Sequence, residues 1–397
     1  MAAPLNPRNM KITSIVGTRP NLAKIEPLLR EMRAHPEVQP VLIHTGQHYN
    51  AGLSANFFSQ MKIPEPNVNL GVGSGSSTWQ TAEIMRRLEP CLLEQHPDLV
   101  LVVGDVNSTL AGALTASRLG IPVAHVEAGL RSFDRSMPEE INRILTDALA
   151  DYLFATEPDA VENLLREGRP RQCIHLVGNV MIDALRHFLP LARESTIGYE
   201  LGLVDEKGGR PFAVLTLHRP SNVDSPMILR TLLQTINSVA DLLPVVFPVH
   251  PRTETKLREL GNPSHPRLRF LAPLGYLDFL CLLSYATVVL TDSGGIQEET
   301  TALRVPCLTL REATERPVTV REGTNQIVGH APETILAAVR DVLAGRHNFG
   351  RVPTLWDGRA AKRILEVLLN EESQVTTCPE PSAKKVDSVS VSIPAAS

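Results

Sequence analysis

The sequence lacks several features that would assign it to a large functional class. None of its 397 residues lie in an apolar run approaching the roughly 18 residues that a membrane-spanning helix needs. The N-terminus, MAAPLNPRNMKITSIVG, is polar and contains prolines, so we predict no signal peptide, no membrane association and a cytoplasmic protein. The net charge is −4 and no basic block occurs, which argues against a nucleic-acid partner.

Two further motifs are missing. Cys91, Cys173, Cys281, Cys307 and Cys378 show neither CxxC pairing nor the spacing of a metal site, so we expect ordinary thiols in a reducing compartment. The G-x-G-x-x-G fingerprint is absent as well, which argues against NAD held in the usual way. We therefore predict a small ligand, with positive charge confined to its pocket.

Short apolar runs alternate with helical patterns along most of the chain. Runs that are apolar on both faces, as in parallel strands covered by helices, occupy residues 11–16, 40–45, 99–105, 121–127, 151–157 and 174–179. A second series occupies residues 212–218, 244–250, 268–275, 286–292, 305–311 and 326–329. Each series is typical of one doubly wound α/β domain. We predict two Rossmann-like domains facing a cleft, with the ligand at the carboxyl ends of the strands.

A polar, turn-rich stretch near residues 186–211 separates the two series. We place the N-terminal domain at 1–187 and the C-terminal domain at 188–355. Residues 356–371 contain an amphipathic helix that we expect to pack back on the N-terminal domain. Residues 372–397 are polar and poor in aromatic side chains, and we predict that they are disordered.

The residues just after the N-terminal strands carry charges suited to a ligand. Arg19 follows the glycine turn after the first strand and Lys24 lies in the next helix, so both could face a diphosphate; the alternative is a turn with solvated cations. Asp105 and Glu127 end two neighbouring strands, and Glu139 opens a helix. Carboxylates that converge on one site are natural acid–base groups. Asp105 could instead cap the next helix.

The C-terminal half supplies a different set of side chains. His218 and His250 each end a strand, where a histidine can act as an acid, a base or a phosphate partner, although one alone is more often structural. Ser293-Gly294-Gly295 places backbone amides at a helix N-terminus, which suits a phosphate oxygen. Glu299 lies one turn further and could accept hydrogen bonds from two ribose hydroxyls, whereas Glu298 should point elsewhere. The alternative is a capped helix with a solvated glutamate.

Ten motifs in this order resemble one known family. They lie between about residues 11 and 330 and read GTRP, TGQH, GD-x-NSTLA, HVEAGLRS, MPEEINR, GN-x-MID, TLHRPSNVD, FPVHPRT, LTDSGGIQEE and LREATERP. The sequence is similar to the non-hydrolysing UDP-N-acetylglucosamine 2-epimerases. The resemblance implies the two-domain fold of the GT-B glycosyltransferases, a homodimer, and no metal or other cofactor. It also implies interconversion of UDP-GlcNAc and UDP-ManNAc through loss of UDP to a 2-acetamidoglucal.

The resemblance implies roles for individual residues. It makes Asp105, Glu127, Glu139 and His218 catalytic. It assigns the binding of UDP and substrate to Arg19, Lys24, Phe279, Ser293, Gly294, Gly295, Glu299 and Arg316. The pattern of residues alone had pointed to neither Phe279 nor Arg316.

The sequence also departs from the family pattern. Asn21 replaces a glutamate, and Arg304 stands where a glycine is usual. Some members bind a second UDP-GlcNAc as an activator, and the candidates for such a site here are Gln47, His48, Gln80 and His250. An arginine and a glutamine of that pocket are missing, so we expect activation to be absent or different.

Two other activities are compatible with the sequence. One is 2-epimerisation of a UDP-linked diacetamido-glucuronate, whose extra carboxylate would need a further cation such as Arg131 or Arg304. The other is glycosyl transfer by a GT-B enzyme, which the absence of a basic amphipathic helix and the number of carboxylates disfavour.

Overall fold

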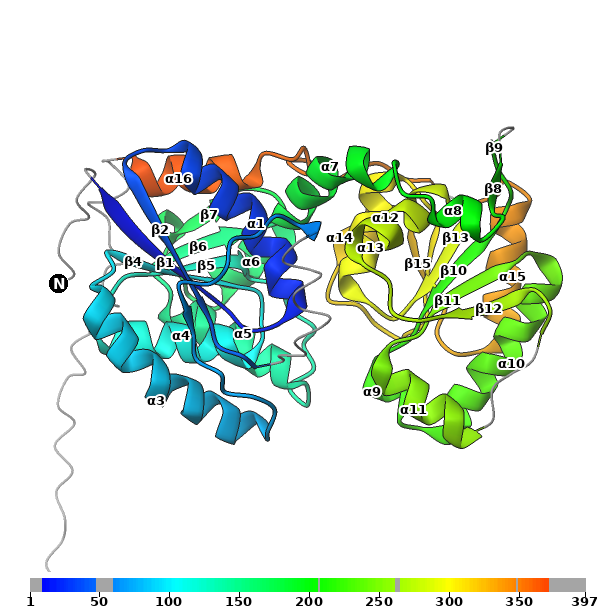
Figure 1. Cartoon of the computed structure of the whole chain (residues 1–397), viewed down its shortest axis with the longest axis horizontal. Coiled ribbons are helices and arrows are strands. Elements are labelled where there is room, and N and C mark those ends of the chain that lie inside the picture. The colour runs from blue at the N-terminus through cyan, green and yellow to red at the C-terminus, as the bar shows by residue number, and fades with distance from the viewer. Residues whose placement is uncertain (1–8, 48–59, 206–207, 261–264, 348, 371–397) are drawn as a thin grey trace, which may run out of the picture.

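The computed structural model describes residues 9–47, 60–205, 208–260, 265–347 and 349–370. The described chain forms two α/β domains side by side, each built on one parallel sheet (Figure 1). The predicted tail at 372–397 lies outside the described residues.

The N-terminal domain contains a seven-stranded sheet in the order β3-β2-β1-β4-β5-β6-β7. Its strands are β1 (Met10–Val16), β2 (Val38–His44), β3 (Val68–Asn69), β4 (Leu99–Val103), β5 (Val123–Ala128), β6 (Tyr152–Ala155) and β7 (Ile174–Leu176). Its helices are α1 (Arg19–Ala34), α3 (Ser77–Gln95), α4 (Asn107–Arg118), α5 (Pro138–Leu149), α6 (Pro158–Arg166) and the short η1 (Arg171–Cys173). All six of the predicted runs are strands, and β3 is an additional short edge strand.

The C-terminal domain repeats the strand order with six strands, β12-β11-β10-β13-β14-β15. They are β10 (Ala213–Thr216), β11 (Val245–Pro248), β12 (Leu268–Leu271), β13 (Val288–Thr291), β14 (Cys307–Thr309) and β15 (Asn325–Ile327). The helices are α9 (Pro220–Val223), α10 (Pro226–Leu242), α11 (Pro251–Leu260), α12 (Tyr276–Tyr285), α13 (Gly294–Leu303), α14 (Pro317–Arg321) and α15 (Pro332–Leu343). The predicted class, two doubly wound α/β domains, is confirmed.

The strands carry apolar side chains on both faces, which explains why helices cover both faces of each sheet. In β4, Leu99, Leu101 and Val103 face a core shared with α1 and α7, whereas Val100 and Val102 face a second core shared with α3 and α4. A strand buried on both faces must be apolar at every position, and this is the pattern that its sequence shows. The carboxyl ends of these strands carry the polar residues of the candidate site.

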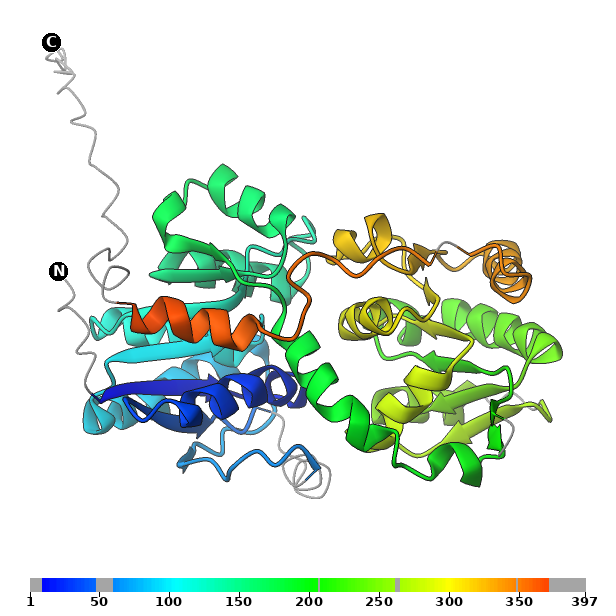
Figure 2. The same ribbon diagram turned by 90° about the horizontal axis from the view of Figure 1, so that it is seen from above.

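Helix α7 (Val180–Ala192) contacts both domains. It packs against α1 on one side and against α12 and α13 on the other (Figures 1 and 2). The boundary that we place at 187/188 therefore falls inside a helix, and α8 (Ile197–Glu200) and the small β8 (Val204–Asp205) and β9 (Gly208–Gly209) pair follow it.

The last described helix, α16 (Ala360–Leu369), packs against α1 and α7 of the N-terminal part (Figure 2). Its first turn is held by Asp183 of α7, whose carboxylate accepts hydrogen bonds from the backbone amides of Ala360 and Ala361 at 3.1 and 2.8 Å. Burial raises the pKa of Asp183 to about 6. The buried apolar face of α16, including Ile364 and Leu365, completes the core over α1.

Candidate active site

A buried network of ion pairs lies where the two domains meet. Glu127, at the end of β5, contacts Lys24 of α1 and Arg316, which precedes α14. The Arg316 Nε atom is also 2.7 Å from Oε1 of Glu298 in α13. All four side chains are at most 10% exposed. The network therefore joins an N-terminal carboxylate to a C-terminal cation.

The backbone of Glu127 is in an unusual conformation. Its φ is +73°, a left-handed value that non-glycine residues rarely adopt, and the pairing of β5 with β6 shifts register between Val126 and Ala128. A bulge of this kind turns one side chain away from the regular alternation of a strand. Strained backbone at a charged residue is characteristic of functional sites, because the surrounding structure must hold it there.

Cations keep the two strand-end carboxylates ionised. The Asp105 Oδ2 atom lies 2.6 Å from Nη2 of Arg143. Burial opposes the charge of Asp105, but Arg143, Lys24 and Arg316 outweigh it and lower its pKa. Burial likewise opposes the charge of Glu127, and Lys24 and Arg316 again hold the pKa below its usual value. Both groups are therefore bases, not acids, near neutral pH.

The substitution of glutamate by Asn21 has a physical explanation. The Asn21 Oδ1 atom accepts hydrogen bonds from the amides of Gly17 and Thr18 at 3.3 Å each, which caps α1. Its Nδ2 donates to the Val103 carbonyl at 3.1 Å and so ties the turn after β1 to the end of β4. A glutamate carboxylate can accept but not donate such a bond. The side chain of the neighbouring Arg19 lies outside the described part of the structure.

Helix α5 brings two acidic residues of different kinds. Glu140 is buried, accepts hydrogen bonds from the amides of Ser132 and Phe133 at 2.9 Å each, and pairs with Arg143 at 2.9 Å. It anchors the segment that precedes the helix. Glu139 is partly exposed and lies one turn before Arg143, the partner of Asp105, on the same face of the helix. Helix α5 therefore carries both Glu139 and the cation that pairs with Asp105, and the catalytic role of Glu139 stays a prediction.

In the C-terminal domain, a buried aspartate holds His218. The Asp292 Oδ1 atom lies 2.8 Å from Nδ1 of His218, and Oδ2 accepts the backbone amides of His218 and Arg219, each at 2.9 Å. Asn222 donates a further bond to the same oxygen at 3.1 Å. A carboxylate on Nδ1 orients the imidazole and leaves Nε2 as the ring nitrogen for a ligand.

The glycine turn before α13 is tightly packed on one side. A Cβ at Gly294 would lie 2.8 Å from Oε1 of Glu315, whereas one at Gly295 would meet nothing closer than 4.0 Å. Ser293 caps the start of the helix, and its amide donates to Oγ1 of Thr291 at 3.0 Å. A side chain at position 294 would have to displace the Glu315 carboxylate, and the amides at this helix N-terminus form a site suited to an anion.

Glu315 would repel an anion if its charge were not compensated. It pairs with Arg219 at 3.0 Å and with Arg311 at 2.8 Å. Burial opposes its ionisation, but Arg316, Arg311 and Arg219 together lower its pKa well below the usual range. The cluster around Glu315 therefore presents excess positive charge beside the glycine turn.

The two glutamates of α13 have different partners. Glu299 is buried and accepts a hydrogen bond from the Tyr276 hydroxyl at 3.2 Å, and burial raises its pKa to about 7. Glu298 accepts a bond from Nδ2 of Asn179 at 2.9 Å in addition to its pairing with Arg316. Glu298 thus belongs to the ion-pair network, although its position in the sequence had suggested that it points elsewhere.

Several residues of the site escape sequence reasoning. Asp292 directly follows an apolar strand and could have been found by the same rule that selected Asp105. Glu315 and Asn179 give no such signal, because their partners lie far away in the sequence. Phe279, on α12, is partly buried and packs against an apolar cluster that includes Leu283 and Ile296.

The candidates for a second ligand site are engaged within the protein. Gln47 accepts the amide and hydroxyl of Ser108 at 3.1 and 2.7 Å. Gln80 donates to the carbonyls of Gln47 and Gly73 at 3.1 and 2.8 Å and accepts from Asn107 at 2.8 Å. The His250 ring centre lies 5.7 Å from that of His218. His48 is outside the described residues.

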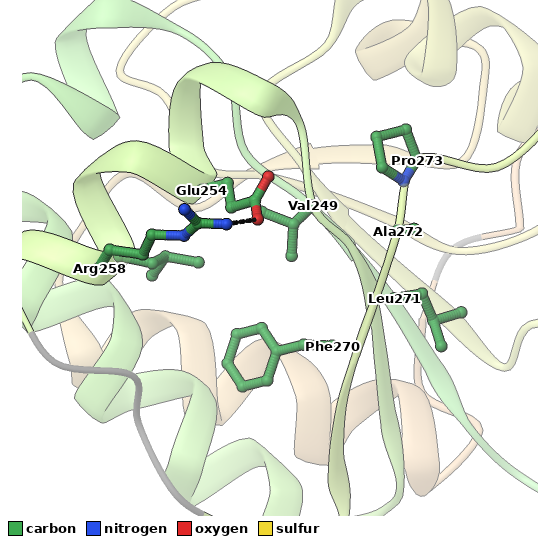
Figure 3. Close-up of a pocket in the computed structure, with 8 residues that line it drawn as sticks. Val249, Glu254, Arg258, Phe270, Leu271, Ala272 and Pro273 are labelled. Carbon is green, nitrogen blue, oxygen red and sulfur yellow. Dashed lines mark hydrogen bonds and ion pairs between the residues drawn. The ribbon is translucent and has the colours of Figure 1, made fainter. Parts of the chain in front are cut away.

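One pocket of about 290 Å³ lies between α11 and the segment after β12 (Figure 3). Val249, Phe270, Leu271 and Pro273 give it a largely apolar lining. Its cation, Arg258, is paired with Glu254 at 2.6 Å, as Figure 3 shows. A diphosphate needs uncompensated donors, so the chemistry of this pocket does not suit one.

The described residues offer neither a metal cluster nor a membrane-spanning helix. They contain no group of three or more histidine, cysteine, aspartate or glutamate side chains that could hold a metal ion. None of the helices in the described ranges is both long enough and apolar enough to cross a bilayer.

Comparison with known proteins identifies the family. A family model described as UDP-N-acetylglucosamine 2-epimerase matches residues 30–369. The chain belongs to the UDP-N-acetylglucosamine 2-epimerase family. It is 41% identical over 368 residues to the UDP-N-acetylglucosamine 2-epimerase of Methanocaldococcus jannaschii, covering 90% of this chain and 99% of that protein. The family resemblance of the ten motifs is thereby confirmed.

One solved structure and one further member of the epimerase family bear on the substrate. The crystal structure of the Methanocaldococcus jannaschii UDP-GlcNAc 2-epimerase in complex with UDP-GlcNAc and UDP matches with a TM-score of 0.83, covering 90% of this chain and 99% of that one at 41% identity. The UDP-2,3-diacetamido-2,3-dideoxy-D-glucuronate 2-epimerase of Pseudomonas aeruginosa is 39% identical over 362 residues, covering 90% and 99% of the two chains. Two family members named for different UDP-sugars are thus almost equally similar in sequence to this chain.

Proposed function

We propose that this protein interconverts UDP-GlcNAc and UDP-ManNAc without releasing the free sugar. The observation that carries the proposal is the contact of Glu127 with Lys24 and Arg316, which brings a carboxylate base and two cations into one buried network. Epimerisation by elimination needs this combination: a base for the proton on C2 and positive charge for the departing diphosphate. The family relationship supports the same activity.

The proposed reaction has two steps, elimination of UDP and its re-addition, and both use the carboxylates of the site. A carboxylate, Glu127 or Asp105, removes the proton from C2 while the C1–oxygen bond breaks and its electron pair leaves with UDP. A C1–C2 double bond forms, giving the 2-acetamidoglucal. Return of a proton to the opposite face of C2, with addition of UDP at C1, gives the epimer. Two faces require two acid–base groups, and we propose that they come from Asp105, Glu127 and Glu139.

The diphosphate has a second role in this proposal. Lys24 and Arg316 contact Glu127 and lower its pKa. A diphosphate at the turn of residues 293–295 would attract Arg316 and share its charge. The pKa of Glu127 would then rise, which would make it a stronger base when the diphosphate is bound. We place the phosphates at this turn and near His218, and the ribose at Glu299.

The second candidate substrate is UDP-diacetamido-glucuronate, favoured by the similarity to the Pseudomonas aeruginosa enzyme. That sugar would need a cation for its carboxylate. Arg131 is buried and paired with Asp147 at 2.7 Å and Glu167 at 2.5 Å. Arg304 is exposed at the C-terminal end of α13, at the opposite end of the helix from the glycine turn. Neither cation that the sequence offers is placed for this substrate, so UDP-GlcNAc is our first choice.

The experiment is to incubate the protein with UDP-GlcNAc in heavy water and to follow the sugar by NMR. UDP-ManNAc that carries deuterium at C2 and keeps its nucleotide is the expected product. Free ManNAc and UDP would mean a hydrolysing enzyme instead. If UDP-GlcNAc remains unchanged and undeuterated while UDP-diacetamido-glucuronate reacts, the second candidate replaces the first.

We also propose a cytoplasmic homodimer. The four described cysteines are unpaired thiols, as expected in a reducing compartment. Helices α3, α4 and α5 pack side by side, and Trp79, Leu93, Ile141 and Leu145 of α3 and α5 are more than 40% exposed. Exposed apolar side chains on adjacent helices suit an interface between two copies. Light scattering after gel filtration should give the mass of a dimer for the wild type and of a monomer for Leu145→Arg.

A further inference from the structure

His125 is a buried histidine of β5 whose two ring nitrogens both have partners. The Nδ1 atom lies 2.6 Å from Oδ1 of Asp147 in α5, and the Nε2 atom lies 2.8 Å from the carbonyl oxygen of Gly104. The ring has no exposed surface, and Asp147 is 1% exposed. Gly104 immediately precedes Asp105, so this ring is bonded to the turn that carries a candidate acid–base carboxylate.

The chemistry of the two partners fixes the protonation state of the ring. A backbone carbonyl can only accept a hydrogen bond, and an ionised carboxylate can only accept one as well. A neutral imidazole has a single N–H and could satisfy only one of them. Both contacts are therefore hydrogen bonds only if the ring carries two protons and a positive charge.

The alternative, a proton on Asp147 and a neutral ring, conflicts with the other contacts of that carboxylate. The Asp147 Oδ2 atom accepts the amide of Gly129 at 3.0 Å and lies 2.7 Å from Nη2 of Arg131. Burial opposes ionisation of Asp147, but His125 and Arg131 outweigh it and lower the pKa of the carboxyl. Arg131 is in turn paired with Glu167 at the end of α6. Asp147 is thus held as a carboxylate.

A second buried histidine of the same sheet shows the opposite arrangement. The Nδ1 atom of His44, at the end of β2, accepts the amide of Gly46 at 3.0 Å and must therefore lack a proton. Burial lowers the pKa of His44 to about 4. The two rings are similarly buried, so the difference between them lies in their partners and not in their exposure.

The carbonyl of the next residue is held in the same way. Asn142 of α5 donates from Nδ2 to the Asp105 carbonyl at 2.9 Å. Gly104 has a φ of +69°, a left-handed conformation that glycine adopts readily. Two consecutive carbonyls, of Gly104 and Asp105, thus accept hydrogen bonds from buried donors, and the Asp105 carboxylate on the same turn pairs with Arg143.

We propose that His125 is a positioning residue of the active site, which, as an imidazolium bonded to both Asp147 and the Gly104 carbonyl, fixes the Gly104–Asp105 turn. It does not touch the substrate. Its contribution is to hold the Asp105 carboxylate in place for proton transfer and to keep a positive charge beneath the acid–base groups. The role in catalysis rests on the proposed function, whereas the charge state does not.

The first test measures the charge state without reference to activity. Protein labelled with ¹⁵N in its histidines is studied by NMR near pH 7, and the number of protons on each ring is read from its nitrogen signals. The expected result is one ring with a proton on both nitrogens that is missing from the spectrum of His125→Gln. His44, with an unprotonated Nδ1, is the internal contrast. If the signal that disappears in His125→Gln comes from a ring with a single proton, the proposal is overturned.

The second test uses two substitutions that each keep one donor. The amide of His125→Gln can replace Nε2 and still reach the Gly104 carbonyl, whereas that of His125→Asn can replace Nδ1 and still reach Asp147. Since a small misplacement of a reacting group can cost roughly 100-fold in rate, we expect kcat to fall about 100-fold for asparagine and about tenfold for glutamine. The KM for UDP-GlcNAc should change less than about threefold, because binding groups are untouched.

The controls separate positioning from folding. His175→Asn changes a half-buried histidine of β7 in the same domain and should leave kcat unchanged. Equal losses in the two His125 variants, in parallel with their unfolding temperatures, would assign His125 to stability alone and overturn the proposal. A wild-type protein without epimerase activity would instead refute the proposed function, and the NMR result would still decide the charge state.

Discussion

The two domains share one strand order but place different chemistry at the same positions. In each sheet the first strand of the domain lies between the second and the fourth: β1 lies between β2 and β4, and β10 lies between β11 and β13. At the N-terminal sheet the strand ends carry Asp105 and Glu127, and at the C-terminal sheet they carry His218 and the turn starting at Ser293. In folds of this kind a ligand lies at the carboxyl ends of the strands, and the proposed function assigns the sugar chemistry to the N-terminal domain and nucleotide binding to the C-terminal domain.

Two buried glutamates show how the domains differ. Lys24 and Arg316 contact Glu127, and its pKa is lowered despite burial. Glu299 is equally buried but contacts a tyrosine hydroxyl, and its pKa rises to about 7. At similar burial, the two cations beside Glu127 outweigh desolvation, whereas at Glu299 desolvation outweighs the hydrogen bond from Tyr276. The comparison predicts that different substitutions will reduce the rate of epimerisation and the affinity for the nucleotide.

The largest effect is expected for Glu127→Gln in the N-terminal domain. Loss of the base should lower kcat about 1,000-fold, within the range of general acid–base groups. UDP affinity should stay the same or increase, because Arg316 no longer has Glu127 as a competing partner. NMR of the sugar gives the rate and calorimetry the affinity. Glu89→Gln, at an exposed position of α3, is the matched control, and equal losses of rate and UDP affinity would contradict the division between the domains.

The next effect is expected in the C-terminal domain, at the glycine turn. In Gly294→Ala the added Cβ would lie 2.8 Å from a Glu315 oxygen, whereas in Gly295→Ala the closest atom would be 4.0 Å away. We expect the first substitution to weaken UDP binding by about tenfold or more, a loss of about 1.4 kcal/mol or more, and the second to change it little. Calorimetric titration of both variants with UDP checks this. Equal affinities would show that the turn does not bind the phosphates.

Most of the fold was predictable because its strands are buried on both faces. A continuous apolar run such as residues 99–103 leaves few alternatives to a parallel strand between helices. β3 was missed because Val68–Asn69 is a two-residue edge strand with no pattern of its own. The course of α7 was also not predictable, since its contacts with both domains depend on how these pack together.

The candidate site was predictable only where it follows the strand ends. A search of the strand ends selects Asp105, Glu127, His218 and the turn at Ser293. In the structure all of them lie at or just after the carboxyl ends of strands in the two sheets. Such a search does not select Arg316, because a cation in a loop gives no sign that it will meet a carboxylate 189 positions earlier. Contacts between domains depend on their packing, which local patterns do not contain.

A smaller, pH-dependent effect should separate Glu299 from the phosphate site. With a pKa of about 7, the carboxyl is mostly protonated below pH 7 and ionised above it. Ribose hydroxyls donate more strongly to the ionised form, so UDP affinity should rise by up to about tenfold between about pH 6 and pH 8. Calorimetry with 2′-deoxy-UDP, which shares the titrating diphosphate, should give a shallower dependence. Glu299→Gln should remove the difference, and equal slopes for both nucleotides would place the ribose elsewhere.

The smallest effect concerns another non-glycine residue with a left-handed backbone, Arg304, which has a φ of +59° at the C-terminal end of α13. Unlike Glu127, it is exposed and lies outside the ion-pair network, so its strain should have no function. Relief of a left-handed conformation gains about 1–2 kcal/mol, and the added freedom of glycine in the unfolded chain offsets about 0.5–1 kcal/mol of this. We therefore expect Arg304→Gly to raise the free energy of unfolding by roughly 0.5–1 kcal/mol, measured by urea denaturation.

Arg304→Gly should also leave epimerisation of UDP-GlcNAc unchanged. A gain in stability without a change in rate would show that strain at Arg304 can be removed freely, whereas the strain at Glu127 accompanies a charged group that the site uses. If instead Arg304→Gly loses activity on a UDP-linked glucuronate that the wild type accepts, Arg304 reaches the sugar. The C-terminal domain would then contribute to sugar recognition as well as to nucleotide binding, and the division between the two domains would no longer hold.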